Sequence, residues 1–254
     1  MQLIVDDEHL GTSETVWRRC DQLTALPRLE VTAIPKVILV APHPDDEVFG
    51  AGGLLQRVLS LGIPVEVLAV TDGERSHPHS KAVLPGELAS RRSDESQEAL
   101  RRLGWGEPVI SRLRIPDGEV QTHRDVLRDA LVAKLQRGDW CLAPWRFDGH
   151  PDHDACGAVA LQACGAVGAV LFGYLVWAWH WAAPHTSDIP WSGCWQLPLS
   201  RNERARKRWA TNAFVTQISS VGPSRSDAAV LPAPLLRRFW RPYEVYVGET
   251  GLST

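Results

Sequence analysis

The sequence lacks the long apolar run that a membrane-spanning helix needs, because no stretch approaches about 20 consecutive apolar residues. Its first ten residues also lack the charged start and apolar centre of a secretory signal. Lys and Arg (27) do not outnumber Asp and Glu (30), and a formal net charge of -3 leaves no basic footprint for nucleic acid. We therefore expect a cytoplasmic protein whose partner is neither a membrane nor a nucleic acid.

Cysteine is scarce and scattered along the chain. The five residues are odd in number and include no CxxC pair. They are Cys20, Cys141, Cys156, Cys164 and Cys194. This pattern indicates neither a disulfide framework nor a thiolate zinc site, and it fits the reducing cytosol.

One stretch, residues 37–53, concentrates the polar chemistry of the chain. It reads VILVAPHPDDEVFGAGG, so five apolar residues lead directly into a His and three carboxylates, and a glycine-rich helix start follows. An apolar run of this length is typical of a strand buried on both faces of a parallel sheet. The pattern predicts a strand that carries polar side chains at its C-terminal end, where open α/β sheets bind their ligands.

The rest of the chain alternates between strand and helix patterns. Strands are expected at residues 36–41, 64–70, 113–115, 140–144, 170–181, 195–199 and 243–247. Helices are expected at residues 50–61, 87–103, 123–136, 154–167 and 201–214. Residues 75–86 read as an irregular loop beyond a strand end, a candidate lid. This alternation predicts an α/β fold with a mostly parallel sheet.

The two ends of the chain are less regular than its centre. Residues 1–35 are expected to form an N-terminal extension, in which Thr12 or Ser13 caps a short helix that carries Trp17 and Leu23. The C-terminal third mixes short elements with a Ser/Pro/Ala loop at residues 219–234. No repeat or low-complexity linker interrupts the sequence, so we expect residues 1–254 to form one domain.

Tryptophan is frequent, with 11 residues, several of them late in the chain. Trp177, Trp179 and Trp181 alternate at strand period within the expected strand at residues 170–181, which would place all three on one face. They could form an apolar wall for a hydrophobic part of a ligand. Burial against a helix is the alternative.

Two polar clusters follow two of the expected strands. His43, Asp45, Asp46 and Glu47 form the first, and residues 150–154 (HPDHD) form the second. His43 and Asp46 are three apart on a turn and can converge on one metal ion while Asp45 stands beside it. A third ligand from the second cluster would complete a site of two His and one carboxylate, as in catalytic zinc centres. The alternative for either cluster alone is a helix cap with acidic residues in the first turn.

These motifs resemble the signature of the LmbE-like/PIG-L family of zinc-dependent de-N-acetylases. The matching segments are HPDDE at residues 43–47 with GAGG at 50–53, and GHPDH at 149–153. Similar segments of the family also fall at residues 71–74, 92–95 and 116–118, so the resemblance spans most of the chain. It implies a Rossmann-like, three-layer α/β fold.

The resemblance also implies a role for individual residues. His43, Asp46 and His153 would bind Zn²⁺, although Fe²⁺ is equally compatible with two His and one carboxylate. Asp45 would be the general base, and a protonated His150 would stabilise the oxyanion or pass a proton to the leaving amine. Glu47 would support the metal loop through hydrogen bonds.

Arg92 and Asp117 match positions that hold the substrate in members of that family. Without the resemblance, Arg92 reads as an exposed helical charge beside Glu95 and Ser96. Asp148 occupies a position where some members carry a Tyr that acts as an oxyanion donor, and it could equally be a turn residue before Gly149.

The function implied by the resemblance is hydrolysis of an N-acetyl group from a GlcNAc-type sugar in a small conjugate or natural product, which gives acetate and a free amine. An amidase that acts on a mycothiol-like conjugate is one alternative. The other is a non-catalytic nucleotide- or sugar-binding module in which the GAGG stretch cradles phosphate, although that stretch lacks the G-x-G-x-x-G spacing.

Overall fold

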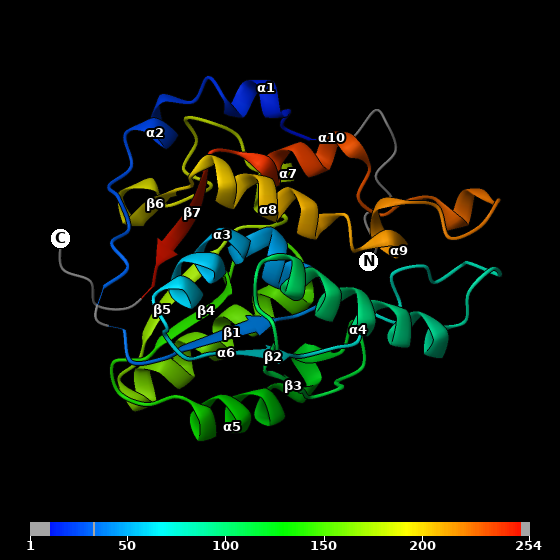
Figure 1. Ribbon diagram of the computed structural model, residues 1–254, viewed down its shortest axis with the longest axis horizontal. Coiled ribbons are helices and arrows are strands. Elements are labelled where there is room, and N and C mark those ends of the chain that lie inside the picture. Colours follow the sequence, from blue (N-terminus) through cyan, green and yellow to red (C-terminus); the bar gives the residue numbers. More distant parts are fainter. Residues whose placement is uncertain (1–10, 33, 250–254) are drawn as a thin grey trace.

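The fold is built on one seven-stranded sheet, seen edge-on in Figure 1, with the strand order β3-β2-β1-β4-β5-β7-β6. This computed structural model describes residues 11–32 and 34–249. The strands are β1 Val37–Ala41, β2 Val65–Ala69, β3 Ile110–Arg112, β4 Trp140–Pro144, β5 Val170–Tyr174, β6 Cys194–Pro198 and β7 Tyr243–Gly248. Strands β1 to β5 are parallel, whereas β7 runs antiparallel to both β5 and β6. The mostly parallel α/β sheet is therefore confirmed.

The chain reverses its direction of winding between β1 and β4. From β1 it proceeds outward through β2 to β3, and it then returns to β4 on the other side of β1 and continues to β5. In open α/β sheets the crevice outside the carboxyl ends of two such strands is the usual ligand site. Both expected polar clusters follow these two strands.

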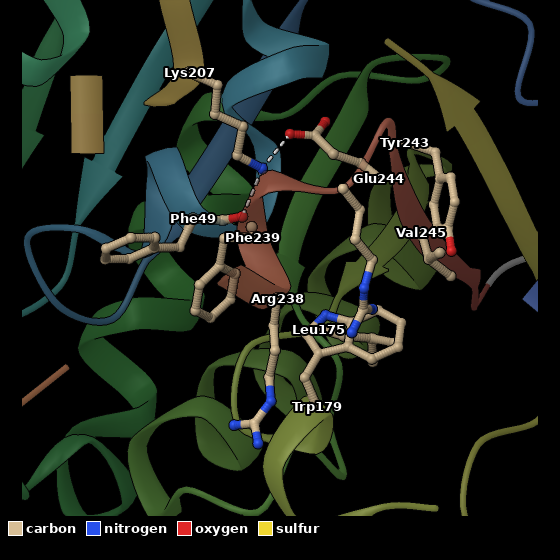
Figure 2. A pocket seen from close by; sticks show the side chains of 11 residues that line it. Phe49, Leu175, Trp179, Lys207, Arg238, Phe239, Tyr243, Glu244 and Val245 are labelled. Atoms are coloured by element: carbon tan, nitrogen blue, oxygen red, sulfur yellow. Dashed lines mark hydrogen bonds and ion pairs between the residues drawn. The ribbon is translucent and has the colours of Figure 1, made fainter. Parts of the chain in front are cut away.

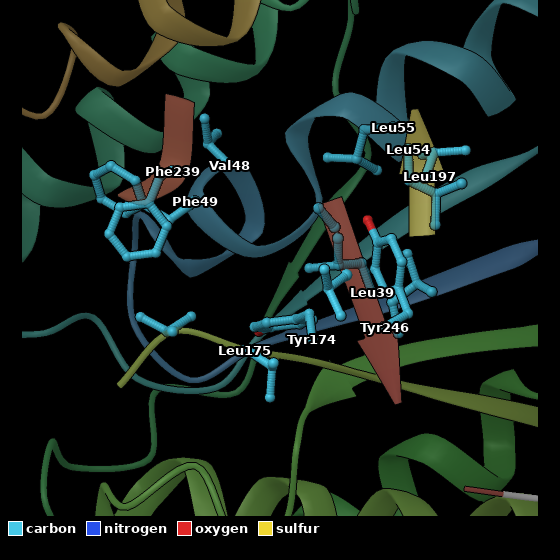
Figure 3. Close-up of a cluster of buried hydrophobic side chains, with 14 of the residues drawn as sticks. Leu39, Val48, Phe49, Leu54, Leu55, Tyr174, Leu175, Leu197, Phe239 and Tyr246 are labelled. Carbon is cyan, nitrogen blue, oxygen red and sulfur yellow. The ribbon is translucent and has the colours of Figure 1, made fainter. Parts of the chain in front are cut away.

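Helices cover both faces of the sheet and create three layers, as expected (Figure 1). The longer helices are α3 Asp46–Ser60, α4 Pro85–Arg102, α5 Arg124–Lys134, α6 Pro151–Val167 and α8 Arg201–Thr211. Strand β1 shows why two cores form, because its side chains alternate between faces. Leu39 belongs to the core beneath α3, shown in Figure 3, and Ile38 and Val40 belong to the core beneath α5 and α6.

Shorter elements make up the two ends of the chain. They are α1 Glu14–Trp17, α2 Asp21–Thr24, α7 Ala178–Trp181, α9 Val215–Ile218, α10 Ala233–Leu236, and the 3-10 turns η1 Val120–His123, η2 Trp191–Gly193, η3 Arg225–Asp227 and η4 Arg237–Trp240. Ser13 caps α1 as expected, but the expected N-terminal helix is broken in two. Residues 1–10 and 33 of the expected extension lie outside the described residues.

Two expected strands are placed differently in the structure. The third strand lies at Ile110–Arg112 and not at residues 113–115, because this edge strand has a polar centre and little apolar signal. The expected strand at residues 170–181 ends at Tyr174 and is followed by the helical turn α7. The single face expected for the three tryptophans is therefore wrong: Trp179 is buried against Trp17, whereas Trp181 is 45% exposed.

Both helices that follow the polar clusters begin earlier than expected. Helix α3 begins at Asp46 and α6 at Pro151, so the polar residues lie in first helical turns as well as in loops. Across the described ranges, no helix is both long and apolar enough to cross a membrane. All five cysteines are buried free thiols.

Candidate metal centre

The candidate site lies where the carboxyl ends of β1 and β4 meet. His43 follows β1, and Asp46 begins α3. His150 caps α6 after β4, and His153 lies in the first turn of the same helix. Pairing of Val37 with Trp140 and of Leu39 with Leu142 sets β1 beside β4 and so brings the two clusters together.

Three candidate ligand atoms form a nearly equilateral triangle. Asp46 Oδ2 lies 3.3 Å from His43 Nδ1 and 3.2 Å from His153 Nε2, and the two ring nitrogens are 3.4 Å apart. Ligand atoms at about 2.0–2.2 Å from a tetrahedral ion lie about 3.3–3.6 Å from one another. The triangle therefore has the size that a dication bound by two His and one carboxylate requires.

The other nitrogen of each of these imidazoles faces a buried carboxylate. His43 Nε2 lies 3.3 Å from both Asp117 and Asp152, and His153 Nδ1 lies 2.8 Å from Asp148. Such carboxylates fix the tautomer and orientation of metal-binding histidines. When the rings are neutral, this leaves lone pairs for a metal ion on His43 Nδ1 and His153 Nε2, two of the three corners of the triangle.

Two other groupings of possible ligands lie nearby. His43, His150 and His153 place ring nitrogens within 4.8 Å of one another, and His43 also comes this close to Asp117 and Asp152. The latter carboxylates face the nitrogen of His43 that points away from the triangle, and Asp152 accepts backbone hydrogen bonds from residues 118 and 120. We therefore interpret them as outer carboxylates.

The electrostatics of the triangle favour a bound cation. Burial alone would raise the pKa of the Asp46 carboxyl, but the charges of His153 and His43 hold it well below its ordinary value. Burial would lower the pKa of His153, but Asp46 and Asp148 raise it to about 9. The three carboxylates around His43 likewise raise its pKa, against the effect of burial. The pocket is thus a strongly anionic environment for the two rings, which hold protons where a metal ion could bind.

Asp45 stands beside the triangle in an unusual backbone conformation. Its φ of 147° lies in a region that L-residues rarely adopt. Two contacts hold it there: Glu47 accepts a hydrogen bond from Asp45 N (3.0 Å), and the Arg92 guanidinium binds Asp45 Oδ2 (3.1 Å). Glu47 is itself fixed by the Ser96 hydroxyl at 2.5 Å, so it supports the loop as expected. Strain of this kind is typical of functional loops.

The pKa of Asp45 is raised to about 8. Burial is the main cause, Arg92 opposes it, and the neighbouring Asp46 carboxylate adds to it. A carboxylate with a pKa near the working pH can accept a proton and later release it. The position beside the triangle therefore suits the role of general base.

His150 lies against the triangle without being one of its corners. Its ring centroid is 4.9 Å from that of His43 and 5.0 Å from that of His153. Its Nδ1 accepts a hydrogen bond from Asp152 N (3.2 Å), which leaves the proton of the neutral ring on Nε2. Burial and the two neighbouring histidines lower its pKa to about 3. The expected imidazolium is therefore disfavoured, and the neutral ring is a hydrogen-bond donor through Nε2.

The two expected substrate residues lie at the site but are already engaged. Arg92 is only 2% exposed, so its reading as an exposed helical charge is wrong. Besides Asp45, its guanidinium binds the carbonyls of Gly73 and Pro44, both at 2.9 Å. Asp117 accepts a hydrogen bond from Arg75 N (3.0 Å) and faces His43.

Asp148 makes a contact with the candidate ligand His153 that the sequence pattern conceals. It is fully buried, and its carboxylate binds His153 and accepts backbone N–H groups of residues 176, 177 and 178 at 2.9–3.0 Å. Its position five residues before His153, on the same helix-start motif, is the only signal that could have indicated this contact.

Side chains from other elements pack directly against the glycines of the GAGG stretch. A Cβ atom on Gly50 would lie 2.2 Å from the Tyr174 ring, and one on Gly53 would lie 2.4 Å from Leu199. These glycines allow α3 to pack closely on the sheet and on the C-terminal third. This packing argues against the phosphate cradle of the binding-module alternative.

Comparison with known proteins gives a consistent result. The sequence model described as "PIG-L: GlcNAc-PI de-N-acetylase" matches residues 38–164, half of the chain. The chain is 32% identical over 139 residues to the diacetylchitobiose deacetylase of Thermococcus kodakarensis (53% of this chain, 51% of that protein). It is 29% identical over 136 residues to 1D-myo-inositol 2-acetamido-2-deoxy-alpha-D-glucopyranoside deacetylase 1 of Saccharopolyspora erythraea (53% and 42%). It thus spans about half the length of these curated relatives.

Among solved structures, a conserved protein from Thermus thermophilus superposes with a TM-score of 0.60 at 26% identity. The superposition covers 87% of this chain and 97% of that one. Because the superposition covers most of both chains, the two proteins share the α/β fold.

Proposed function

The chain belongs to the PIG-L, GlcNAc-PI de-N-acetylase family, and from this premise we propose that it is a metal-dependent hydrolase that removes an N-acetyl group from a GlcNAc-type sugar. The observation that carries the proposal is the triangle of His43 Nδ1, Asp46 Oδ2 and His153 Nε2, with Asp45 beside it. Both named relatives are deacetylases of N-acetylated sugars, which supports the substrate class.

The three corners of the triangle would hold the metal ion, and Asp117, Asp152 and Asp148 would orient the two imidazoles. A dication with two His and one carboxylate is Zn²⁺ or Fe²⁺ by ligand type. When bound, it polarises a carbonyl oxygen and lowers the pKa of water from about 15.7 to about 7.

The residues around the triangle divide the proton transfers between them. Asp45 takes a proton from the attacking water, and Arg92 fixes its carboxylate in position for this. His150 donates a hydrogen bond from Nε2 to the oxygen that becomes negative at the acetamide carbon. When the C–N bond breaks, the proton held by Asp45 passes to the leaving nitrogen, so the products are acetate and a free amine.

The first prediction concerns Asp45. Purified protein should contain about one metal ion per chain and should release acetate from N-acetylglucosamine conjugates when loaded with Zn²⁺ or Fe²⁺. Asp45→Asn should keep the metal and lose turnover by about 10²–10⁴-fold, because general base catalysis supplies about that factor. Asp46→Ala should lose both metal and turnover, because it removes one corner of the triangle.

Metal analysis and an acetate-release assay together decide the outcome. Full activity of Asp45→Asn would overturn its role as base. Release of a larger acid in place of acetate would favour an amidase on a mycothiol-like conjugate. Binding of a dinucleotide by metal-free protein, with no hydrolysis of any amide, would favour the non-catalytic module.

A further inference from the structure

Two tryptophans lie beside the candidate catalytic residues. Trp177 stacks on His150, with ring centroids 5.7 Å apart and planes inclined by 26°. Trp181 is 45% exposed and covers Gly149, where a Cβ atom would lie 2.5 Å from its Nε1. We call these two side chains the tryptophan platform.

The helical turn α7 explains why these two rings share a face. Residues four apart on a helix lie on the same side, and Trp177 is the N-cap of α7 while Trp181 is its last residue. Trp179, halfway between them, points into the core, where its ring lies 5.1 Å from that of Trp17. The platform therefore faces the site, and the intervening tryptophan anchors the turn.

Asp148 ties the platform rigidly to the metal centre. The carboxylate that binds His153 also accepts the backbone N–H of Trp177, and the Asp148 carbonyl accepts a hydrogen bond from Trp181 Nε1 at 2.7 Å. A preorganised apolar surface binds a ligand without a large entropic cost. The platform is thus a built part of the site, held by the same residue that orients a candidate metal ligand.

The charged groups next to the platform already have partners: Asp154 accepts a hydrogen bond from Gly149 N, and Arg238 binds His180, whose ring lies 5.4 Å from that of Trp177. Within residues 11–32 and 34–249, arginine side chains stack on other rings: Trp209, Phe147, Trp240, Trp17 and Trp179. The Asp148 carboxylate is fully buried and has its oxygens bound by other donors. The two rings therefore offer flat apolar surface on this side of the site, and no arginine stacks on either of them within the described residues.

We propose that the tryptophan platform binds the aglycone of the substrate, and that this aglycone is an apolar or aromatic group linked to the N-acetylated sugar. The inference rests on the proposed function, since it places the sugar at the triangle. Aromatic groups stack on tryptophan with a preference beyond the area they bury. A phenyl group next to the sugar should therefore improve binding, whereas a methyl group should not reach the platform.

The test compares phenyl and methyl glycosides of N-acetylglucosamine, with both acetate release and calorimetric binding as readouts. The phenyl glycoside should have the lower KM and the lower Kd, with a similar kcat. Trp181→Ala should raise KM and Kd for the phenyl glycoside by about tenfold, and it should raise them far less for the methyl glycoside. Trp181→Phe should retain part of the preference.

The matched control is Trp209→Ala, because Trp209 is 57% exposed on α8, away from the site. It should leave both glycosides unaffected. Equal Kd values for the two glycosides, or an equal loss for both in Trp181→Ala, would overturn the platform. If neither glycoside releases acetate but the phenyl preference in binding persists and depends on Trp181, the platform stands and the proposed function fails.

Discussion

The protonation state of Asp45, the candidate base, depends on Arg92. It is buried on α4, and its guanidinium lies 3.1 Å from Asp45 Oδ2. Burial raises the pKa of Asp45, and the positive charge of Arg92 is the largest effect that lowers it. Arg92, which was expected to bind the substrate, therefore allows the buried Asp45 carboxyl group to ionise.

Replacement of Arg92 by Met should shift the pH dependence of activity. Loss of the guanidinium raises the pKa of Asp45 further above about 8, so the fraction of deprotonated base falls at any pH below that value. The acid limb of the kcat profile should move to higher pH, by roughly one unit or more, and activity should recover in part as pH rises. A pH series of acetate release measures this shift.

The neighbouring Arg91 provides the control for this experiment. Its side chain is 51% exposed and pairs with Glu87 at the surface of the same helix. Arg91→Met should leave the profile where it is. A uniform loss of activity in Arg92→Met at every pH would show that the arginine acts only by holding the loop.

Individual residues were predictable from the sequence where they belong to a compact motif. The positions of His43, Asp46 and His153 at two strand ends follow from apolar runs that lead into polar clusters. The burial of Arg92 did not follow, because its neighbours along α4 are polar and only the fold brings Asp45 to it. A lone Asp before Gly has the pattern of a turn, and this concealed Asp148.

At the scale of elements, α3 is kinked at a buried ion pair supplied by the C-terminal third. Ala51 departs from helical geometry, with φ −137° and ψ 15°. Phe49 C=O and Gly53 N–H would be partners in a regular helix. Instead, Lys207 Nζ donates to Phe49 O (2.8 Å), and Glu244 accepts from Gly53 N (2.6 Å). Figure 2 shows Lys207 reaching between Phe49 and Glu244.

This ion pair is buried and held by further hydrogen bonds. Lys207 Nζ and Glu244 Oε1 are 2.6 Å apart, and the second oxygen of Glu244 accepts from Leu54 N and the Tyr246 hydroxyl. Removal of one partner would leave an uncompensated charge in the core, which typically costs about 3–5 kcal/mol. The helix that begins with Asp46 is therefore held by strand β7 and helix α8, both far away in sequence.

Lys207→Met should lower the free energy of unfolding by about 3–5 kcal/mol, measured by urea denaturation. The double variant Lys207→Met with Glu244→Gln should lose less than the sum of the two single variants, because it leaves neither charge unpaired. Asp125→Asn, which breaks the exposed pair with Arg128, should not move the urea midpoint. Additive losses in the double variant would show that the two charges do not act as a pair.

Elements with strong periodicity were predictable, and those shaped by distant contacts were not. Strand β4 matches its expected bounds, because its residues are apolar and bounded by turn signals. In the segment after β5, large and small residues alternate as in a strand. The Asp148 carboxylate, however, accepts hydrogen bonds from three successive N–H groups there, and the chain forms the helical turn α7 instead. The kink of α3 depends on residues 158 and 191 positions later, which no local pattern reveals.

For the molecule as a whole, the candidate centre joins the two halves of the sheet. One ligand pair comes from the β1–α3 connection and the third ligand from the β4–α6 connection. A metal ion bound to the triangle would link these connections and stabilise the folded state by mass action, since the unfolded chain has no such site.

Stabilisation by metal should also depend on pH, with a definite sign. His43 and His153 have raised pKa values, about 9 for His153, so both rings hold protons at neutral pH and must release them to bind a metal ion. The same raised values stabilise the metal-free fold at low pH, and this contribution is lost as pH rises through the folded-state pKa. Zn²⁺ should therefore raise Tm more at pH 8 than at pH 6, as measured by calorimetry with and without chelator.

Two variants serve as controls for this pH dependence. Asp45→Asn should retain the difference in Tm, and Asp46→Ala should abolish it. A Zn²⁺ effect that is equal at both pH values would place the metal away from these two histidines.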